Sequence, residues 1–364
     1  MTTYYVGIGG NDGNNGTTWA LRKLTLNGAE DIPVAAGDTV YVGAGAYREL
    51  LTCDVSGSAG NTITYIGDYD GSHTDGIGGV VRITGSDDDL TATRDYCIYM
   101  SDKVYRAFRG FKFDLCASHL LSVSWAGEYV NIDKCFFGDT LVGNQLFIQN
   151  PTGNCSVTNC YFSACAGGNG GVRVYNATVL DDRNISINNC IFRSKYGITI
   201  AKVGGVLIKN CSFVGCPTYA VVVSAALTEG QTVTVNNSII MGCNNGLVAT
   251  VEGELVENYN TFFSNATNRT NVAVGANSIT YPPVFDSRWF FEATKSGFMK
   301  LLMPFDLASY SPLVNVAGTS PTSTDMRGTA VVGAQREWGA LEYDPSLRIK
   351  GGEGSLVGGG LVRD

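Results

Sequence analysis

The sequence predicts an all-β protein that forms one solenoid, a parallel β-helix, and three observations lead to that prediction. The 364 residues include 46 glycines but only 9 prolines and 16% charged residues, a composition typical of turns and strands. A short motif recurs along the chain, and repeats with periods of 20 to 50 residues indicate solenoids, propellers or arrays. No helical periodicity separates its copies.

Each copy of the motif is a short alternating strand that ends in a polar residue, a small residue and an aromatic residue. There are six copies, "VNIDKCFF" (130–137), "CSVTNCYF" (155–162), "ISINNCIF" (185–192), "VLIKNCSF" (206–213), "VTVNNSII" (233–240) and "VENYNTFF" (256–263). Counted at the sixth position, the steps between copies are 25, 30, 21, 27 and 23 residues.

Three columns of the repeat have a physical interpretation. The fifth position holds asparagine in most copies, and asparagine tolerates the left-handed backbone of a tight corner while its amide can bond to the next coil. The sixth position is small, and we expect the eighth to stack inside the core. The fifth column reads Lys134, Asn159, Asn189, Asn210, Asn237 and Asn260, and the eighth reads Phe137, Phe162, Phe192, Phe213, Ile240 and Phe263.

A second strand signal follows each copy, as in "GVRV" (171–174), "GITI" (197–200), "AVVV" (220–223) and "GLVA" (246–249). A propeller blade needs about 40 residues for four antiparallel strands. About 25 residues per repeat instead suits one coil of short parallel strands stacked on the next. The period therefore favours the β-helix.

The rest of the chain is interpreted around this repeat. We expect an N-terminal strand and capping segment at residues 1–33, the β-helix at 34–345 and a glycine-rich, flexible C-terminal tail at 346–364. The cap candidate is "TTWALRKLTLNGA" (17–29), with Asn27 and Gly28 as its stop, because solenoids need covered ends. Segments 282–289, 309–318 and 331–344 are predicted as last coils and a closing segment.

The eleven cysteines occur largely at repeat positions, which favours buried, reduced thiols over a disulfide framework. The sequence lacks CxxC pairs, and its two histidines, His73 and His119, lie outside any motif. We therefore predict no metal and no cofactor.

Charge and hydropathy exclude two kinds of partner. A net charge of −8 and a pI near 4.9 argue against nucleic-acid binding, which needs a concentrated basic face. No apolar run approaches the roughly 18 residues of a membrane helix. The N-terminus has no basic region followed by a long hydrophobic stretch, so we expect the chain to fold in a cytoplasm.

At this point the sequence resembles a known group. The segments "YYVGIGGNDGNNG", "AGDTVYVGAGAYRE", "NTITYIG" and "SPLVNVAG…DMRG…GALEYD" are similar to those of right-handed parallel β-helix proteins of the pectin lyase-like superfamily, over roughly residues 4–344. The resemblance implies a right-handed coil. That superfamily includes lyases, hydrolases, surface proteins and phage tailspikes, so it implies no single function.

The sequence offers few catalytic candidates. The hydrolases of the superfamily carry paired aspartates with a GHG segment, which this chain lacks, and its lyases use a Lys or Arg base near calcium. The nearest match is Asp181, Asp182 and Arg183 in "LDDRN", and a second acidic cluster is the run 87–89. Calcium takes six to eight oxygen ligands from several segments, so we interpret both clusters as solvated loops and expect no efficient glycan cleavage.

Three functions stay open on the sequence alone. The first is a non-catalytic phage virion protein, a capsid decoration or tail-associated β-helix that also contacts surface glycans. The second is a lyase or hydrolase of acidic polysaccharides, and the third is a glycan-binding surface protein, which would be extracellular. The missing signal favours the virion. We expect a homo-oligomer, a trimer by preference, and a tail that docks on other virion proteins through Leu356, Val357, Leu361 and Val362.

Overall fold

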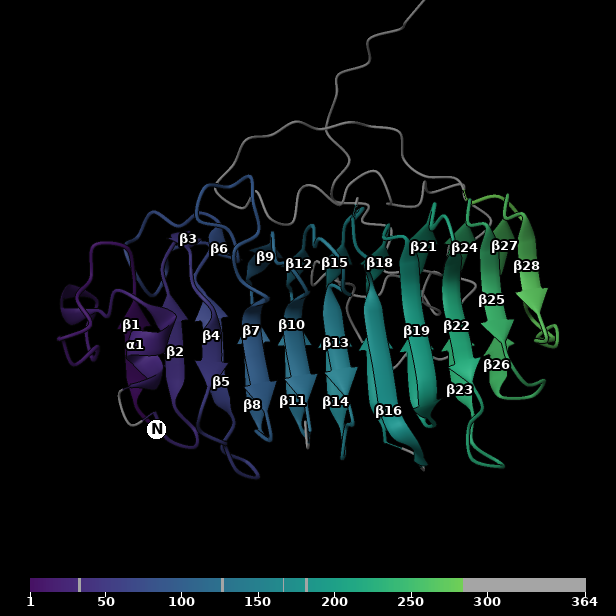
Figure 1. Ribbon diagram of the computed structural model, residues 1–364, viewed down its shortest axis with the longest axis horizontal. Coiled ribbons are helices and arrows are strands. Elements are labelled where there is room, and N and C mark those ends of the chain that lie inside the picture. The colour runs from purple at the N-terminus through teal and green to yellow at the C-terminus, as the bar shows by residue number, and fades with distance from the viewer. Residues whose placement is uncertain (32–33, 126–127, 166, 181–182, 284–364) are drawn as a thin grey trace, which may run out of the picture.

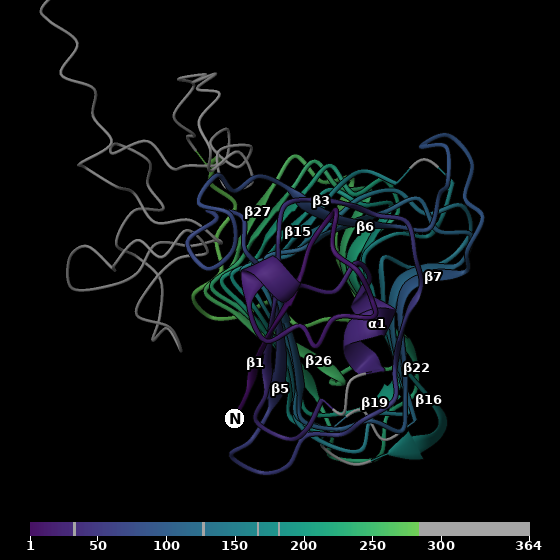
Figure 2. The ribbon, with the colours of Figure 1, turned by 90° about the vertical axis from the view of Figure 1, so that its left-hand side faces the viewer.

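The computed structural model describes residues 1–31, 34–125, 128–165, 167–180 and 183–283, and there the chain winds as a parallel β-helix (Figure 1). Nearly every coil contributes one strand to each of three parallel sheets, A, B and C, which enclose the core. Figure 2 shows the stacked coils from the N-terminal end. The predicted all-β solenoid is confirmed.

The three sheets contain 28 strands in the described residues. Sheet A has ten: β1 (Thr3–Val6), β2 (Thr39–Val42), β5 (Ile63–Gly67), β8 (Arg106–Arg109), β11 (Val130–Asp133), β14 (Cys155–Thr158), β17 (Ile185–Asn188), β20 (Val206–Lys209), β23 (Val233–Asn236) and β26 (Leu255–Asn258). Sheet B has nine: β3 (Gly45–Tyr47), β6 (Val81–Thr84), β9 (Lys112–Asp114), β12 (Phe136–Phe137), β15 (Tyr161–Phe162), β18 (Ile191–Phe192), β21 (Ser212–Val214), β24 (Ile239–Met241) and β27 (Thr261–Phe263). Sheet C has nine: β4 (Leu51–Cys53), β7 (Tyr96–Ser101), β10 (His119–Ser124), β13 (Leu146–Gln149), β16 (Val172–Leu180), β19 (Tyr196–Val203), β22 (Tyr219–Ala225), β25 (Asn245–Ala249) and β28 (Thr267–Thr270).

The corner between sheets A and B explains the asparagine column. Asn159, Asn189, Asn210 and Asn237 have φ values of 55°, 54°, 52° and 54°, the left-handed conformation that asparagine tolerates. The Asn189 amide donates to Asn159 Oδ1 at 3.2 Å, across one coil. Three of the four side chains are at most 2% exposed, so the column is buried as expected, with this bond between two of its amides.

The phenylalanine column forms a stack inside the core. The ring centroids of Phe137, Phe162, Phe192 and Phe213 are 4.6, 4.7 and 4.8 Å apart in succession, with interplanar angles of at most 8°. All four side chains are fully buried. Inter-strand spacing of about 4.8 Å sets this distance, since each ring sits on the equivalent position of the next coil.

The last copy of the repeat is displaced by one residue from the sequence alignment. Because Asn236 pairs with Asn258, the left-handed corner falls on Tyr259 and not on Asn260. Phe262 then enters the core, 1% exposed, whereas Phe263, predicted to be inside, is 37% exposed. The alignment followed the asparagine, but Asn260 occupies the small-residue column.

A short helix closes the N-terminal end, where the cap was expected. The 3-10 helix η1 (Trp19–Leu21) precedes α1 (Leu26–Glu30), which lies at the end of the coils in Figure 2. The predicted stop at Asn27 and Gly28 is wrong, because both residues lie within α1. The Thr25 hydroxyl caps the helix by accepting from the Gly28 N–H, so this glycine belongs to the first turn.

A buried ion pair ties this cap to the core. Arg106 occupies an inward position of β8 between Ile63 and Val130, and its side chain is fully buried. Its guanidinium donates to both carboxylate oxygens of Glu30 in α1, at 2.7 and 2.9 Å. Tyr65 also donates its hydroxyl to Glu30, so the charge is paired and hydrogen-bonded as burial requires.

All eleven cysteines are buried free thiols, as the repeat predicted. Burial raises the pKa of the Cys53 and Cys155 thiols to about 12. None of the described helices is long and apolar enough to cross a membrane. The coils predicted within 284–344 and the tail anchors Leu356, Val357, Leu361 and Val362 lie outside the described residues, and so does the predicted boundary at 345/346.

Candidate functional site

The outer face of sheet C is formed by strands that contain no carboxylate, whereas sheet A contains Asp133 and Glu257 and sheet B contains Asp114. The chain has 33 acidic and 25 basic residues, yet none of the nine strands of sheet C contains an aspartate or a glutamate. Because side chains alternate along a strand, every second residue of these strands faces outward. Aromatic, hydroxyl, amide, aliphatic and basic residues occupy these outward positions.

Two rows of outward residues cross the sheet from coil to coil. The strand register aligns the first row as Tyr99, Ser122, Phe147, Arg173, Thr199 and Val222. It aligns the second as Ser101, Ser124, Gln149 and Tyr175. Neighbours in each row are about 4.8 Å apart, similar to the length of one sugar residue.

Arg173 is the cation at the centre of this face. Its guanidinium carbon lies 5.7 Å from the ring centroid of Phe147 and 5.2 Å from that of Tyr175, which are cation–π distances. Arg173 is not among the arginines that form an ion pair with a carboxylate in the described part of the chain, which are Arg48, Arg82, Arg94, Arg106, Arg109 and Arg269. The buried Nε of Arg173 has no hydrogen-bond partner. Arg173 is therefore a cation whose counter-charge is missing from the described residues.

His119 lies beside this cation. Its ring stacks on Phe147 at 4.6 Å, and its Nδ1 accepts a hydrogen bond from the Asn144 backbone N–H at 2.9 Å. Burial lowers the pKa of His119, and the charge of Arg173 lowers it further, against the opposing effect of the Asn144 backbone contact. Nδ1 also lies 3.3 Å from the Asn144 carbonyl oxygen, the contact that opposes the lowering of the pKa, so the position of the ring proton depends on the tautomer. In either tautomer the neutral ring has one N–H to donate.

Tyrosines flank the two rows on one side. Tyr96 packs on Tyr99 at 5.1 Å between ring centroids, and Tyr196 packs on Tyr219 at 4.8 Å. Burial raises the pKa of Tyr96 and of Tyr219, so both phenols keep their protons at neutral pH. The Lys195 ammonium lies 5.4 Å from the Tyr196 ring centroid. These rings offer apolar faces and hydroxyl groups to a ligand.

The catalytic candidates from the sequence lie elsewhere or outside the described part. Asp181 and Asp182 are not among the described residues. Arg183 lies two residues before the start of β17, and its guanidinium donates to the Thr152 carbonyl at 3.3 Å.

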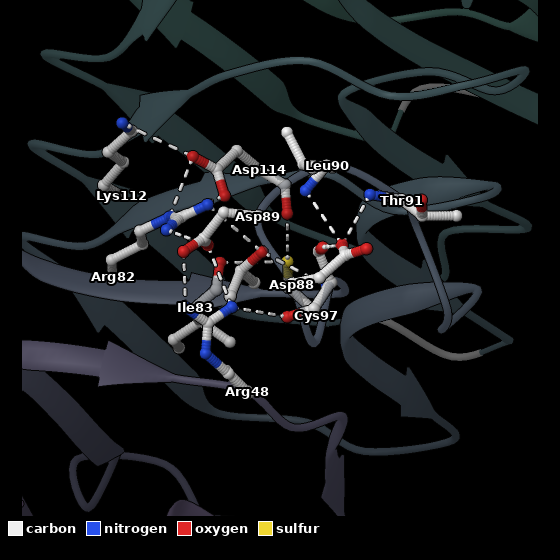
Figure 3. Close-up of polar contacts among 12 residues, drawn as sticks. Arg48, Arg82, Ile83, Asp88, Asp89, Leu90, Thr91, Cys97, Lys112 and Asp114 are labelled. Atoms are coloured by element: carbon white, nitrogen blue, oxygen red, sulfur yellow. Dashed lines mark hydrogen bonds and ion pairs between the residues drawn. The ribbon is translucent and has the colours of Figure 1, made fainter.

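The acidic run 87–89 is neutralised by arginines rather than open to a cation. Asp89 forms ion pairs with both Arg48 and Arg82, and Arg82 also bonds to Asp114 at 2.9 Å (Figure 3). The hydrogen bond from Arg48 is the main cause that lowers the pKa of Asp89 to about 2. This carboxylate is already bound by two guanidinium groups.

The other two carboxylates of the run also have partners. Asp88 accepts from the backbone N–H groups of Leu90 and Thr91, at 2.9 and 2.7 Å, and these contacts lower its pKa to about 2. Asp87 pairs with Arg94 at 2.7 Å. In the described ranges no group of three or more His, Cys, Asp and Glu side chains is placed to hold a metal ion.

Sequence reasoning missed Arg173 and set His119 aside. Both residues stand alone in the sequence, and only the coil register brings them to one face. A usable signal was present all the same, because the strand segments that recur after each asparagine corner contain no carboxylate.

Comparison with known proteins supports the fold. A family model described as "Right handed beta helix region" matches residues 122–281. A rhamnogalacturonan lyase structure is 18% identical with a TM-score of 0.52, covering 72% of this chain and 74% of its own. A GH136 lacto-N-biosidase from Eubacterium ramulus is 11% identical with a TM-score of 0.50, covering 76% and 68%.

The pectate lyase Pel9A is similar over 94% of this chain and 97% of its own, at 14% identity and a TM-score of 0.48. No curated protein sequence matches the chain. At these identities the similarity concerns the fold alone. The chain is an all-β, right-handed parallel β-helix.

Proposed function

We propose that this protein is carbohydrate-active and binds an acidic polysaccharide along the outer face of sheet C. The observation that supports this most directly is Arg173, a guanidinium held between Phe147 and Tyr175 without a carboxylate partner among the described residues. A guanidinium binds a carboxylate through two parallel hydrogen bonds. A uronate residue would supply the missing charge.

The surroundings of Arg173 suit the rest of a sugar polymer. Aromatic rings pack against the apolar faces of sugar rings, and the partly exposed Gln149 offers an amide group for the sugar hydroxyls. Ser122 and Ser124 are buried and hydrogen-bond to each other at 3.2 Å, so they support this face from within. The absence of carboxylates from the strands of sheet C removes the repulsion that a polyanion would meet elsewhere on an acidic protein.

β-Elimination is the reaction that this geometry favours. In that reaction a base removes the proton on the carbon beside the carboxylate, the neighbouring C–O bond breaks, and the leaving oxygen receives a proton. Arg173 would neutralise the carboxylate and so stabilise the carbanion. Hydroxide from the solvent would take the proton from carbon and water would protonate the leaving oxygen, which could also accept a hydrogen bond from the neutral ring of His119. Hydrolysis normally uses two carboxyl groups, which the strands of this face lack.

Two structural neighbours, a rhamnogalacturonan lyase and a lacto-N-biosidase, are by name carbohydrate-active proteins. Nothing in the comparisons supports the phage virion role expected from the sequence, and we do not carry it forward.

The test measures binding and cleavage with one set of variants. Polygalacturonate, alginate and neutral dextran are presented to the wild type, to Arg173→Ala and to Lys209→Ala, which removes a cation from the outer face of sheet A. We expect binding of a polyuronate but not of dextran, and a loss of about 10- to 100-fold in Arg173→Ala only, as for a charge-assisted hydrogen bond. Ultraviolet absorbance of unsaturated uronate products reports elimination. Equal binding by the wild type and Arg173→Ala would refute the proposal.

A further inference from the structure

We propose that Trp125 is a platform on which one sugar ring of the bound polysaccharide stacks. The inference rests on the proposed function, because Trp125 adjoins the outer face of sheet C. It directly follows Ser124, the last residue of β10, and so begins the turn that leads from sheet C to sheet A. Its side chain is 53% exposed, the largest aromatic surface at this corner.

Trp125 has a backbone conformation that a bulky residue rarely adopts. Its φ is 51°, in the left-handed region that glycine, asparagine and aspartate visit routinely. In that region the Cβ atom crowds the following carbonyl oxygen, which lowers the folding equilibrium constant by roughly 5- to 30-fold. Tryptophan at this position therefore reduces stability unless the contacts of its side chain offset the strain.

The strand register identifies the equivalent residues of the neighbouring coils. Trp125 follows β10 as Asp102 follows β7 and Asn150 follows β13, and the ends of these strands are aligned. Asp102 and Asn150 have φ values of 55° and 48°. Both have short polar side chains that bond locally: Asp102 accepts from the preceding serine hydroxyl at 3.4 Å, and Asn150 accepts from the Ala177 N–H at 2.9 Å. In these two coils the side chain suits the corner.

The Trp125 indole has no comparable partner. Among the residues that the structure describes, it takes part in no hydrogen bond, ring stack or cation–π contact. Tyr105 and Tyr129, at the same corner, are also left-handed, with φ values of 53° and 54°, but their rings stack on each other at 4.4 Å. Their stacking offsets their strain. The strain of Trp125 is not offset in this way, and residues held in such conformations cluster at ligand sites.

The position of Trp125 specifies the class of ligand. The register aligns Ser124 with Gln149 and Gln149 with Tyr175, so Trp125 lies two coils, or about 10 Å, from the strand that carries Arg173. That separation equals about two sugar residues. A sugar two residues away from the uronate bound at Arg173 would reach the indole, whose flat apolar surface packs on the apolar face of a sugar ring.

The first experiment measures affinity against ligand length with the full-length protein. Oligouronates of one to six residues, from polygalacturonate and from alginate, are titrated by calorimetry into the wild type, Trp125→Asn and Phe263→Ala. Phe263 is the matched control, since its exposed ring lies on sheet B. We expect the wild-type affinity to rise about 3- to 10-fold at the trisaccharide, when the third sugar reaches the indole, and this rise to vanish in Trp125→Asn only.

The outcomes separate this inference from the proposed function. An equal rise in Trp125→Asn overturns the inference and leaves the proposed function standing. Binding to none of the oligouronates, at any length, refutes both.

The second experiment separates binding from folding. Asn150 shows that asparagine fits this corner, so Trp125→Asn should raise the folding equilibrium constant, by about fivefold in urea denaturation. A tryptophan that serves the fold would lower it on removal, so a loss of stability in Trp125→Asn overturns the proposal. Light scattering covers the remaining alternative: a molar mass that falls in Trp125→Asn would show that a second copy of the chain covers the indole, which also overturns it.

Discussion

The core stack allows a sharp test of the fold, because two phenylalanines with the same expected role occupy different places. Phe192 lies inside, fully buried, with its ring centroid 4.7 Å from Phe162 and 4.8 Å from Phe213. Phe263, which the sequence places in the same column, is 37% exposed. The variants Phe192→Ala and Phe263→Ala therefore remove the same atoms from opposite environments.

The expected costs differ by several kilocalories per mole. Emptying a buried aromatic site lowers the free energy of unfolding by about 3–5 kcal/mol, through lost transfer energy and the cavity left behind. Each lost aromatic pair adds roughly 0.5–1.5 kcal/mol, and Phe192 has two such neighbours, so we expect the upper part of that range. For Phe263→Ala we expect less than about 1 kcal/mol.

Urea denaturation followed by both circular dichroism and tryptophan fluorescence measures these costs, with coincident curves as the check on two-state unfolding. Loss of similar stability in both variants would show that Phe263 is buried and that the corner lies at Asn260 after all. A cost below about 1 kcal/mol for Phe192→Ala would show that the column does not form the core.

The remaining predictions concern charge and thiols. Glu30→Gln should cost about 3–5 kcal/mol in urea, because it leaves the fully buried guanidinium of Arg106 without its counter-charge. The pKa of His119, measured by NMR, should lie below about 6.5; the unfolded state then binds more protons, so stability should fall as pH drops through 6.5, and His119→Phe should remove that dependence. Asp89 has a lowered pKa, so its contribution is complete above about pH 4 and is lost toward pH 2, where the hydrogen-exchange protection factors of residues 85–95 should fall; Asp89→Asn should abolish this change. Ellman's reagent should react slowly with the native protein but titrate eleven thiols after denaturation without reduction, and a count of half or fewer would indicate disulfides.

The repeat in the sequence was sufficient to predict the fold. A solenoid places equivalent residues directly above one another, so each structural need recurs as a column: asparagine at the left-handed corner, a thiol in little space, phenylalanine in the stack. The strands GVRV, GITI, AVVV and GLVA were recognised for the same reason, and all four form part of sheet C.

Register at the C-terminal end was decided by tertiary contacts. In "VENYNTFF" either Asn260 or its neighbour fits a corner, and either phenylalanine fits the stack. The structure selects Tyr259 for the corner because Asn260, once buried, donates to Glu257 and to the Val235 carbonyl, both at 2.8 Å. Glu257 in turn bonds to Arg269 from β28, so the last coil has a polar interior that no local pattern reveals.

The candidate site was likewise beyond the sequence. A face of a β-helix is assembled from single residues about 25 positions apart, so Arg173, His119 and Phe147 share no motif and meet only through the parallel register of sheet C. The sequence around Arg173 does not show that its charge is unpaired either. That follows only from the neighbouring strands of sheet C, which come from distant segments and contain no carboxylate. The coil and its core could be predicted from the sequence, because their residues repeat along the chain. The outer face could not, because its side chains need not repeat and come together only when the coils stack.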